Sequence, residues 1–231
     1  LCDRRQRQMC IRDREYTVTG VEIDSRRVKA GDLFVAIPGE KVDGHKFIPD
    51  VLNKGAYALS QQSLDVDGAY ILVEDTVTAM KRLARFYRST LDIKVVGITG
   101  SVGKTSTKEM IASVLDTKFR VHKTQGNFNN GIGLPLTIFQ IEKEHQVAVL
   151  EMGISDFGEM TRLAKIAKPD TCVITNIGTC HLENLGDRDG VLKAKTEIFK
   201  YVKKNIVLNG DDDKLSTVKE YNGIQPVFFG N

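Results

Sequence analysis

Residues 94–116 read KVVGITGSVGKTSTKEMIASVLD, and this stretch decides the fold of the larger part of the chain. The apolar residues 94–99 predict a buried β-strand, and residues 104–116 predict a helix. A glycine-rich turn joins them, in which Gly100 and Gly103 precede Lys104 and Thr105. This order of strand, turn and helix is typical of a loop whose backbone N–H groups hold phosphate oxygens.

The turn departs from the strict phosphate-loop pattern at one position. In G-x-x-x-x-G-K-[ST] the first glycine would fall at Ile98, so Gly100 has to make the turn instead. Lys104 would add a full positive charge to the partial charge of the helix N-terminus, and Thr105 would offer a hydroxyl to Mg²⁺. The alternative is a glycine-rich turn with a chance lysine, but the flanking strand and helix favour phosphate binding.

The hydrophobic periodicity divides the chain into two α/β units. We predict a small mixed α/β domain over residues 15–90 and a P-loop, Rossmann-like domain with a parallel sheet over residues 91–231. The expected strands are 18–23, 32–37, 56–60, 69–73, 94–99, 119–122, 146–151, 171–176 and 205–209, followed by an apolar strand-like stretch at 226–229. The expected helices are 48–54, 76–90, 104–116, 131–139, 158–167 and 190–201.

Residues 1–14, LCDRRQRQMCIRDR, show no periodicity and no core-forming apolar set, so we expect a non-native leader. The alternative is a basic arm that binds an anionic partner. The chain's net charge is +3, and without the leader basic and acidic residues are equal in number. The overall charge therefore predicts no nucleic-acid partner.

The composition is that of an ordinary globular protein. Of 231 residues, 41% are hydrophobic and 27% are charged, and four cysteines are too few for a disulfide scaffold. No apolar run approaches the roughly 18 to 20 residues of a membrane span, so we expect no membrane insertion. These features favour a reducing, cytoplasmic compartment.

Several polar residues follow predicted strands, where ligands of open parallel sheets bind. Glu151 ends a buried strand, and a carboxylate there is costly unless it pairs with a cation, so we weigh a metal site against a salt bridge to a lysine. His181 follows another strand and alone suggests an ordinary loop histidine. Lys195 alone suggests an exposed surface lysine, and Arg26 an exposed arginine after a turn.

The variant T-G-S-x-G-K-T at residues 99–105 resembles the Mur ligase family, which builds the peptide stem of peptidoglycan. Further stretches agree with this family: 24–26, 126–135, 151–153, 175–178 and 194–199. Residues 108–110 and 151–159 favour the members that join D-alanyl-D-alanine to UDP-N-acetylmuramoyl-tripeptide. The resemblance covers roughly residues 17–231 and stops short of the family's C-terminal domain, so we expect a C-terminally truncated chain, inactive by itself.

The resemblance implies an ATP-dependent, ADP-forming acid–D-amino-acid ligase that acts through an acyl phosphate in cell-wall synthesis, cell shape and cell division. It implies ATP and Mg²⁺ as cofactors, UDP-N-acetylmuramoyl-tripeptide and D-alanyl-D-alanine as substrates, and a monomer in the cytoplasm. Two alternatives stay open: a sibling ligase that adds a different amino acid, and a P-loop nucleotide-binding module without ligation.

The resemblance also assigns roles to single residues. ATP contacts are implied for Thr99, Gly100, Ser101, Val102, Gly103, Lys104, Thr105, Ser106, Asn130 and Asn209. Asn129 is an alternative to Asn130, which we favour. Mg²⁺ ligands are implied at Thr105, Glu151 and His181, and catalytic roles at Lys104, Lys195 and His181. Lys195 would carry a carbamate formed with CO₂, and Ser25 and Arg26 would bind the UDP end of the substrate.

Overall fold

The computed structural model describes residues 17–39 and 42–230. The expected leader, residues 1–14, lies outside these residues. The chain divides into two compact units between Arg82 and Leu83, within helix α3 (Thr76–Thr90). The boundary that we predict, at residue 90, falls at the end of the same helix.

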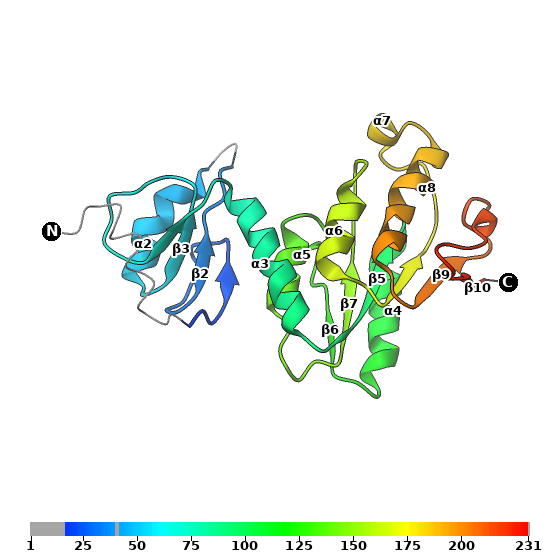
Figure 1. Ribbon diagram of the computed structural model, residues 1–231, viewed down its shortest axis with the longest axis horizontal. Coiled ribbons are helices and arrows are strands. Elements are labelled where there is room, and N and C mark those ends of the chain that lie inside the picture. The colour runs from blue at the N-terminus through cyan, green and yellow to red at the C-terminus, as the bar shows by residue number, and fades with distance from the viewer. Residues whose placement is uncertain (1–16, 40–41, 231) are drawn as a thin grey trace. The chain divides into compact units, whose positions relative to one another are not determined.

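The small unit is a four-stranded sheet with a short helix packed on it (Figure 1). Its elements are β1 (Val21–Glu22), β2 (Leu33–Val35), η2 (Gly44–Phe47), α2 (Ile48–Asn53), β3 (Tyr57–Ser60) and β4 (Tyr70–Leu72). The strands pair in chain order and all run parallel. Phe34 and Ala58 from the sheet and Ile48 and Val51 from α2 form the core of the unit.

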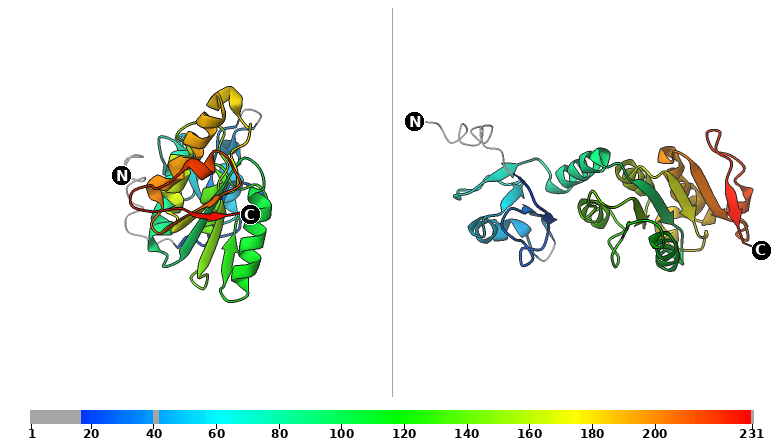
Figure 2. Two further views of the ribbon diagram at one scale, coloured as in Figure 1. Left: turned by 90° about the vertical axis from the view of Figure 1, so that its right-hand side faces the viewer. Right: turned by 90° about the horizontal axis from the view of Figure 1, so that it is seen from below.

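The larger unit is a six-stranded parallel sheet with helices on both sides (Figures 1 and 2). Its strands are β5 (Lys94–Thr99), β6 (Val121–Lys123), β7 (Val147–Glu151), β8 (Thr171–Ile174), β9 (Asn205–Asn209) and β10 (Val227–Phe229). Its helices after α3 are α4 (Lys104–Asp116), α5 (Gly133–Phe139), α6 (Glu159–Ala167), α7 (Leu182–Leu185), α8 (Arg188–Thr196), η3 (Glu197–Tyr201) and η4 (Leu215–Thr217).

The strand order β10-β9-β8-β5-β7-β6 places β5 between β7 and β8. The chain builds β6 and β7 on one side of β5 and then crosses to build β8, β9 and β10 on the other. Ligands of such sheets bind beyond the carboxyl ends of the strands at the point where the direction of building reverses. The loop after β5 lies at that point.

Two hydrophobic cores cover the two faces of this sheet, because successive strand residues point to opposite sides. Ile98 and Val149 meet Ala112 of α4 on one face. Val95 and Leu150 meet the apolar sides of α5, α6 and α8 on the other face. The strand β7 is buried along its whole length, as a central parallel strand requires.

The predicted α/β class is confirmed, and most predicted elements differ from the observed ones only at their ends. Strand 171–176 was predicted too long, because Thr175 and Asn176 leave the ladder to contact the loop after β5. Helix 190–201 was predicted as one helix but is α8 followed by the 3₁₀ turn η3. The short α7, η2 and η4 were not predicted. Within the described ranges, no helix is both long enough and apolar enough to cross a membrane.

Candidate functional site

The loop between β5 and α4 is held in a conformation that needs its glycines. Gly100 has φ +149° and Gly103 has φ +78°, a region that residues with a side chain rarely adopt. A Cβ atom at Gly100 would lie 1.9 Å from Thr175 Oγ1. Gly100 therefore replaces the missing glycine of the strict pattern by letting the loop pack closely against the segment after β8.

Lys104 lies across this loop at the start of α4. Its Nζ donates hydrogen bonds to the carbonyl oxygens of Gly100, at 2.9 Å, and Ser101, at 3.1 Å. The first backbone N–H groups of a helix have no partner within the helix and carry a partial positive charge. The start of α4 thus combines free amide donors with an ammonium group, which suits a phosphate.

A buried carboxylate faces the first turn of α4. Glu151 ends β7 with only 2% of its surface exposed, and its Oε2 accepts a hydrogen bond from Thr105 Oγ1 at 2.9 Å. Its Oε1 accepts from Asn129 Nδ2 at 2.8 Å, and its backbone N–H donates to Thr124 Oγ1 at 3.0 Å. Among the described residues no lysine or arginine pairs with this carboxylate, so the salt bridge that we considered is absent.

The oxygen atoms of Thr105 and Glu151 fit a divalent cation. Mg²⁺ prefers one or two protein oxygens together with phosphate oxygens and water. A carboxylate buried without a positive partner is costly, and a cation would relieve that cost. The described residues contain no cluster of three or more His, Cys, Asp or Glu side chains around such a site.

Lys195 is buried rather than exposed, which contradicts the surface-lysine interpretation. It lies on α8 with 2% of its surface exposed, and no described residue forms a hydrogen bond or ion pair with its amine. Burial lowers the pKa of Lys195 to about 8, with the nearby Cys180 raising it and the charge of Lys104 lowering it. This electrostatic interaction places the Lys195 amine near the phosphate loop.

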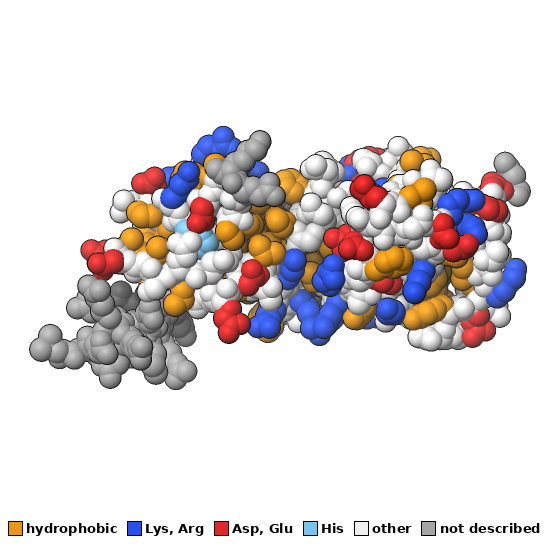
Figure 3. All heavy atoms as spheres, turned by 90° about the horizontal axis from the view of Figure 1, so that it is seen from above, with side chains coloured by type: hydrophobic (Ala, Val, Ile, Leu, Met, Phe, Trp, Pro, Cys, Tyr) orange, Lys and Arg blue, Asp and Glu red, His pale blue; other side chains and the backbone are white. Residues whose placement is uncertain are grey.

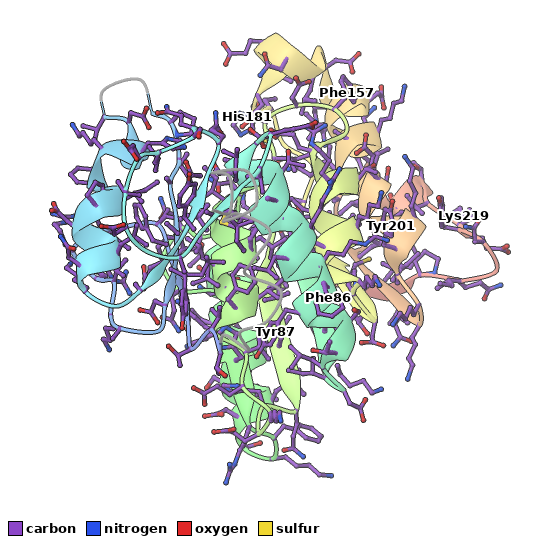
Figure 4. The ribbon with its side chains drawn as sticks, turned by 60° about the vertical axis from the view of Figure 1, so that its left-hand side comes forward. Phe86, Tyr87, Phe157, His181, Tyr201 and Lys219 are labelled. Atoms are coloured by element: carbon purple, nitrogen blue, oxygen red, sulfur yellow. The ribbon has the colours of Figure 1, made fainter. Side chains whose placement is uncertain are left out.

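His181 lies in the segment that follows β8. It precedes α7 with a left-handed backbone, φ +55°, and its side chain is exposed. Figure 4 shows His181 toward the end of the larger unit where Phe157 also lies. The neighbouring Cys180 thiol contacts Ser101 Oγ at 3.1 Å, which brings this segment against the phosphate loop.

The asparagines after β6 have two different surroundings. Asn129 touches Glu151, as described above, and therefore lies at the Thr105–Glu151 pair. Asn130 Oδ1 accepts from the N–H groups of Ile132, at 3.0 Å, and Gly133, at 2.9 Å, at the start of α5. These bonds engage the side-chain oxygen of Asn130 and orient its amide, so its NH₂ group can donate to a ligand.

Asn209 joins the loop after β9 to the loop after β8. Its Nδ2 donates to the carbonyl oxygen of Thr175 at 3.0 Å, and its Oδ1 accepts from the N–H of Asp211 at 3.0 Å. Asp212 adds a second link, since its Oδ2 accepts from the N–H of Ile177 at 2.7 Å. Asn209 therefore lies at the carboxyl edge of the sheet, two strands from the phosphate loop.

Ser25 and Arg26 lie in the small unit, after β1. Arg26 is exposed and pairs with Asp24 through Nε, at 2.9 Å, and Nη2, at 2.6 Å. These hydrogen bonds lower the pKa of Asp24 to about 2. Lys54 Nζ donates to the Ser25 carbonyl oxygen at 2.8 Å, so the turn is held in place while the guanidinium faces solvent.

Three residues that contact the site were not predicted as functional. Asn176 accepts hydrogen bonds from two amides of the phosphate loop, and Thr124 holds the backbone of Glu151. Glu197 accepts from the N–H groups of Gly158 and Thr161 and so fixes the turn after Lys195 to the start of α6. Asn176 had a signal in the sequence because it ends the predicted strand 171–176, and Glu197 lies within the stretch 194–199 that agrees with the family; Thr124 had no such signal.

Comparison with known proteins identifies both units. Residues 98–231 match the family model described as Mur ligase middle domain, and residues 17–88 match the model described as Mur ligase family, catalytic domain. A UDP-N-acetylmuramoyl-tripeptide–D-alanyl-D-alanine ligase of Bacillus subtilis is 46% identical over 198 residues, which are 84% of this chain and 43% of that protein. The ligase of the same name from Escherichia coli is 37% identical, over 86% of this chain and 45% of that protein.

Solved structures give the same result. A crystal structure of MurF from Acinetobacter baumannii has a TM-score of 0.86 and 36% identity, over 92% of this chain and 48% of that one. The MurF ligase from Thermotoga maritima in complex with ADP has a TM-score of 0.83 and 38% identity, over 94% of this chain and 51% of that one. The chain thus spans about half the length of the relatives that it matches.

Proposed function

Because the chain belongs to the Mur ligase family, we propose that it carries the UDP-substrate and ATP sites of an ADP-forming ligase of peptidoglycan precursor synthesis. The ligase joins D-alanyl-D-alanine to UDP-N-acetylmuramoyl-tripeptide, the reaction that the names of its relatives state. The observation that carries this proposal is the buried Glu151 carboxylate, which accepts a hydrogen bond from the exposed Thr105 hydroxyl beside the phosphate loop. These two side chains would bind Mg²⁺ together with the phosphate oxygens of a nucleotide.

The proposed reaction has two steps. The terminal carboxylate of the tripeptide attacks the γ-phosphorus of ATP, which gives an acyl phosphate and ADP. The amine of D-alanyl-D-alanine then attacks the acyl carbon, an amide bond forms, and inorganic phosphate leaves with the loss of a proton from the amine. The protein mainly positions the reactants and stabilises charge on the transferred phosphoryl group.

Lys104 and the loop from Thr99 to Ser106 form the site of the ATP phosphates in this proposal. The Lys104 ammonium reaches the transferred group by exchanging its two loop carbonyl partners for phosphate oxygens. Asn130 offers its oriented NH₂ group to the phosphates, and Asn209 lies at the edge of the sheet toward the nucleoside. Mg²⁺ would neutralise phosphate charge: Thr105 and Glu151 would hold one ion, and His181 would help to hold a second.

Lys195 is proposed to act as a carbamate. Carbamate formation needs a neutral amine, which adds to the carbon of CO₂ and loses a proton. Burial brings the pKa of Lys195 to about 8, so a useful fraction of the amine is neutral near physiological pH. The carbamate would replace the cation on this nearly buried side chain by an anion that orients a metal ion, and His181 would share this catalytic task.

The small unit is proposed to bind the UDP end of the substrate. Arg26 is the proposed diphosphate contact because its guanidinium is exposed, and a diphosphate would replace Asp24 as its partner. Acidic and basic side chains are interspersed on the face that Figure 3 shows, in keeping with small anionic substrates rather than a nucleic acid. We further propose a monomer that works in the cytoplasm, where ATP and reduced cysteines such as Cys172 and Cys180 are expected.

Amine selection tests the proposed function. The chain is fused to the portion of the Bacillus subtilis relative that it does not span, and ADP release is measured with ATP, Mg²⁺ and UDP-N-acetylmuramoyl-tripeptide. The expected result is ADP release that depends on D-alanyl-D-alanine and not on lysine, diaminopimelate or glutamate. Preference for one of those amines would assign a sibling ligase, and ADP release that ignores all amines would leave only a nucleotide-binding module.

A further inference from the structure

Asn176 occupies two amides of the phosphate loop. Its Oδ1 accepts hydrogen bonds from the N–H groups of Ser101 and Val102, both at 3.0 Å. Its own carbonyl oxygen also accepts from Ser101 at 3.1 Å. We propose that Asn176 is a positioning residue that turns these two amides away from the nucleotide and leaves the amides from Gly103 onward to bind phosphate. This inference rests on the proposed ATP site.

The segment around Asn176 completes the hold on the loop. Thr175 Oγ1 donates to the carbonyl oxygen of Val102 at 2.7 Å. The Gly178 N–H donates to Ser101 Oγ at 2.8 Å. The N–H groups, a carbonyl and a side chain of the first half of the loop are therefore all engaged by protein. A phosphate could recruit the Ser101 and Val102 amides only by breaking their hydrogen bonds to Asn176, which leaves the Asn176 side-chain oxygen without its two donors.

The backbone on both sides of Asn176 is fixed by hydrogen bonds from other side chains, so the position of Asn176 is fixed as well. The Ile177 N–H donates to Asp212 Oδ2 at 2.7 Å, and the Ile177 carbonyl oxygen accepts from Arg188 Nε at 2.9 Å. Asn209 Nδ2 binds the Thr175 carbonyl oxygen at 3.0 Å. Three side chains, from the start of α8, the end of β9 and the loop after β9, thus fix the backbone on both sides of Asn176.

The fixed loop also sets the place of Lys104. The two carbonyl oxygens that receive the Lys104 ammonium belong to Gly100 and Ser101, within the part of the loop that Asn176 holds. Asn176 therefore acts on phosphate binding through both the free amides of α4 and Lys104. A neutral amide is suited to this role, because a carboxylate would accept the same two bonds but repel the phosphates.

Two variants and a control test the inference in the chain as it is. Asn176→Ala removes the acceptor, and Asn176→Asp keeps the acceptor but adds a charge. Asn205→Ala is the control, since Asn205 Nδ2 bonds Thr171 Oγ1 at the opposite end of the sheet. Amide hydrogen exchange of Ser101 and Val102 is followed by NMR, and ADP affinity is measured by titration calorimetry with Mg²⁺.

In Asn176→Ala the exchange of these two amides is expected to accelerate at least tenfold while the melting temperature of the unit changes little. The Kd for ADP is expected to rise about tenfold in Asn176→Ala, the scale of one or two lost hydrogen bonds, and by a similar factor in Asn176→Asp, because the added carboxylate repels the phosphates. Asn176→Asp should keep slow exchange. Asn205→Ala should change neither quantity.

The experiment distinguishes a failure of the proposed nucleotide site from a failure of the inference about Asn176. If the wild-type chain binds no ADP, the proposed nucleotide site fails, while the exchange measurement still tests the hold on the loop. Unchanged exchange and unchanged affinity in Asn176→Ala would overturn the inference, and so would tighter ADP binding, because the freed amides would then bind phosphate. If Asn176→Ala does not fold, an ADP affinity of Asn176→Asp equal to that of the wild type overturns it.

Discussion

Replacing Lys195 with Met should make the protein more stable and inactive at the same time. The Lys195 side chain is almost fully buried, with 2% of its surface exposed, and no described residue forms a hydrogen bond or ion pair with its amine, whereas Met fills a similar volume without a charge. A residue that costs stability in the folded state is retained for another reason, in this case the proposed carbamate. The experiment is run in CO₂-free buffer so that the lysine stays unmodified.

The size of the gain follows from the pKa of Lys195. Burial lowers this pKa from 10.5 to about 8 in the folded protein. Each unit of pKa difference corresponds to about 1.4 kcal/mol, so the buried charge costs about 3 kcal/mol when the lysine is protonated in both states. The penalty is complete below pH 8. It shrinks as pH rises from 8 to 10.5, where the folded state has lost the proton and the unfolded state still binds it.

Urea unfolding at several pH values measures this gain, and Lys193→Met is the matched control because Lys193 is an exposed lysine on the same helix. Lys195→Met should be more stable than the wild type at pH 7, and the difference should vanish toward pH 10.5. Lys193→Met should show little difference at any pH. A Lys195→Met protein that is no more stable than the wild type at pH 7 would refute the argument from burial. In the fusion protein the same variant should lose turnover, and a small carboxylate in the buffer should restore part of it.

Three further predictions concern the loop and its neighbours. Lys104→Ala should lower the turnover of the fusion protein by a factor of about 10² or more, because it removes the charge beside the transferred phosphoryl group. The melting temperature should not change, because the side chain binds only two loop carbonyls in the free protein. A near-normal kcat would refute the role of the loop. Glu151→Gln should raise the Mg²⁺ concentration needed for half-maximal ADP binding at least tenfold without loss of stability, and an unchanged Mg²⁺ requirement in calorimetric titrations would place the metal elsewhere. Gly100→Ala should lower the free energy of unfolding by about 2 kcal/mol or more, since the new Cβ meets Thr175 Oγ1. Gly186→Ala is the control, because Gly186 also has a positive φ but a Cβ there would meet no atom within 4 Å. Equal losses of stability in urea unfolding would show that backbone strain alone matters.

The elements with a strong periodic pattern were predictable to the residue. The helices 76–90 and 104–116 and the strands 94–99 and 205–209 have the predicted bounds. Strand 171–176 was predicted too long because Thr175 is as strand-like as the residues before it, and only the contacts of Thr175 and Asn176 with the phosphate loop end the strand at Ile174. The break between α8 and η3 was not predictable either, because it depends on Glu197 reaching the start of α6.

The candidate site was predictable where it depends on strand ends. Thr105 and Glu151 are 46 residues apart in the chain, and they meet because β5 and β7 are neighbours in a parallel sheet. The burial of Lys195 carried a signal that the surface-lysine interpretation overlooked. Val191, Ala194, Lys195 and Ile198 are spaced as one helical face, and all four are buried. The hold of Asn176 on the loop depends on how two segments pack, which no local pattern encodes.

A crystal structure of the chain with ADP and Mn²⁺ tests the central claim most directly, because the anomalous signal of manganese locates the metal without assumption. The account predicts a manganese peak within coordination distance of Thr105 Oγ1 and the Glu151 carboxylate, with the diphosphate at the start of α4 beside Lys104. A metal and a diphosphate bound at another edge of the sheet, with the Thr105–Glu151 hydrogen bond intact, would contradict it.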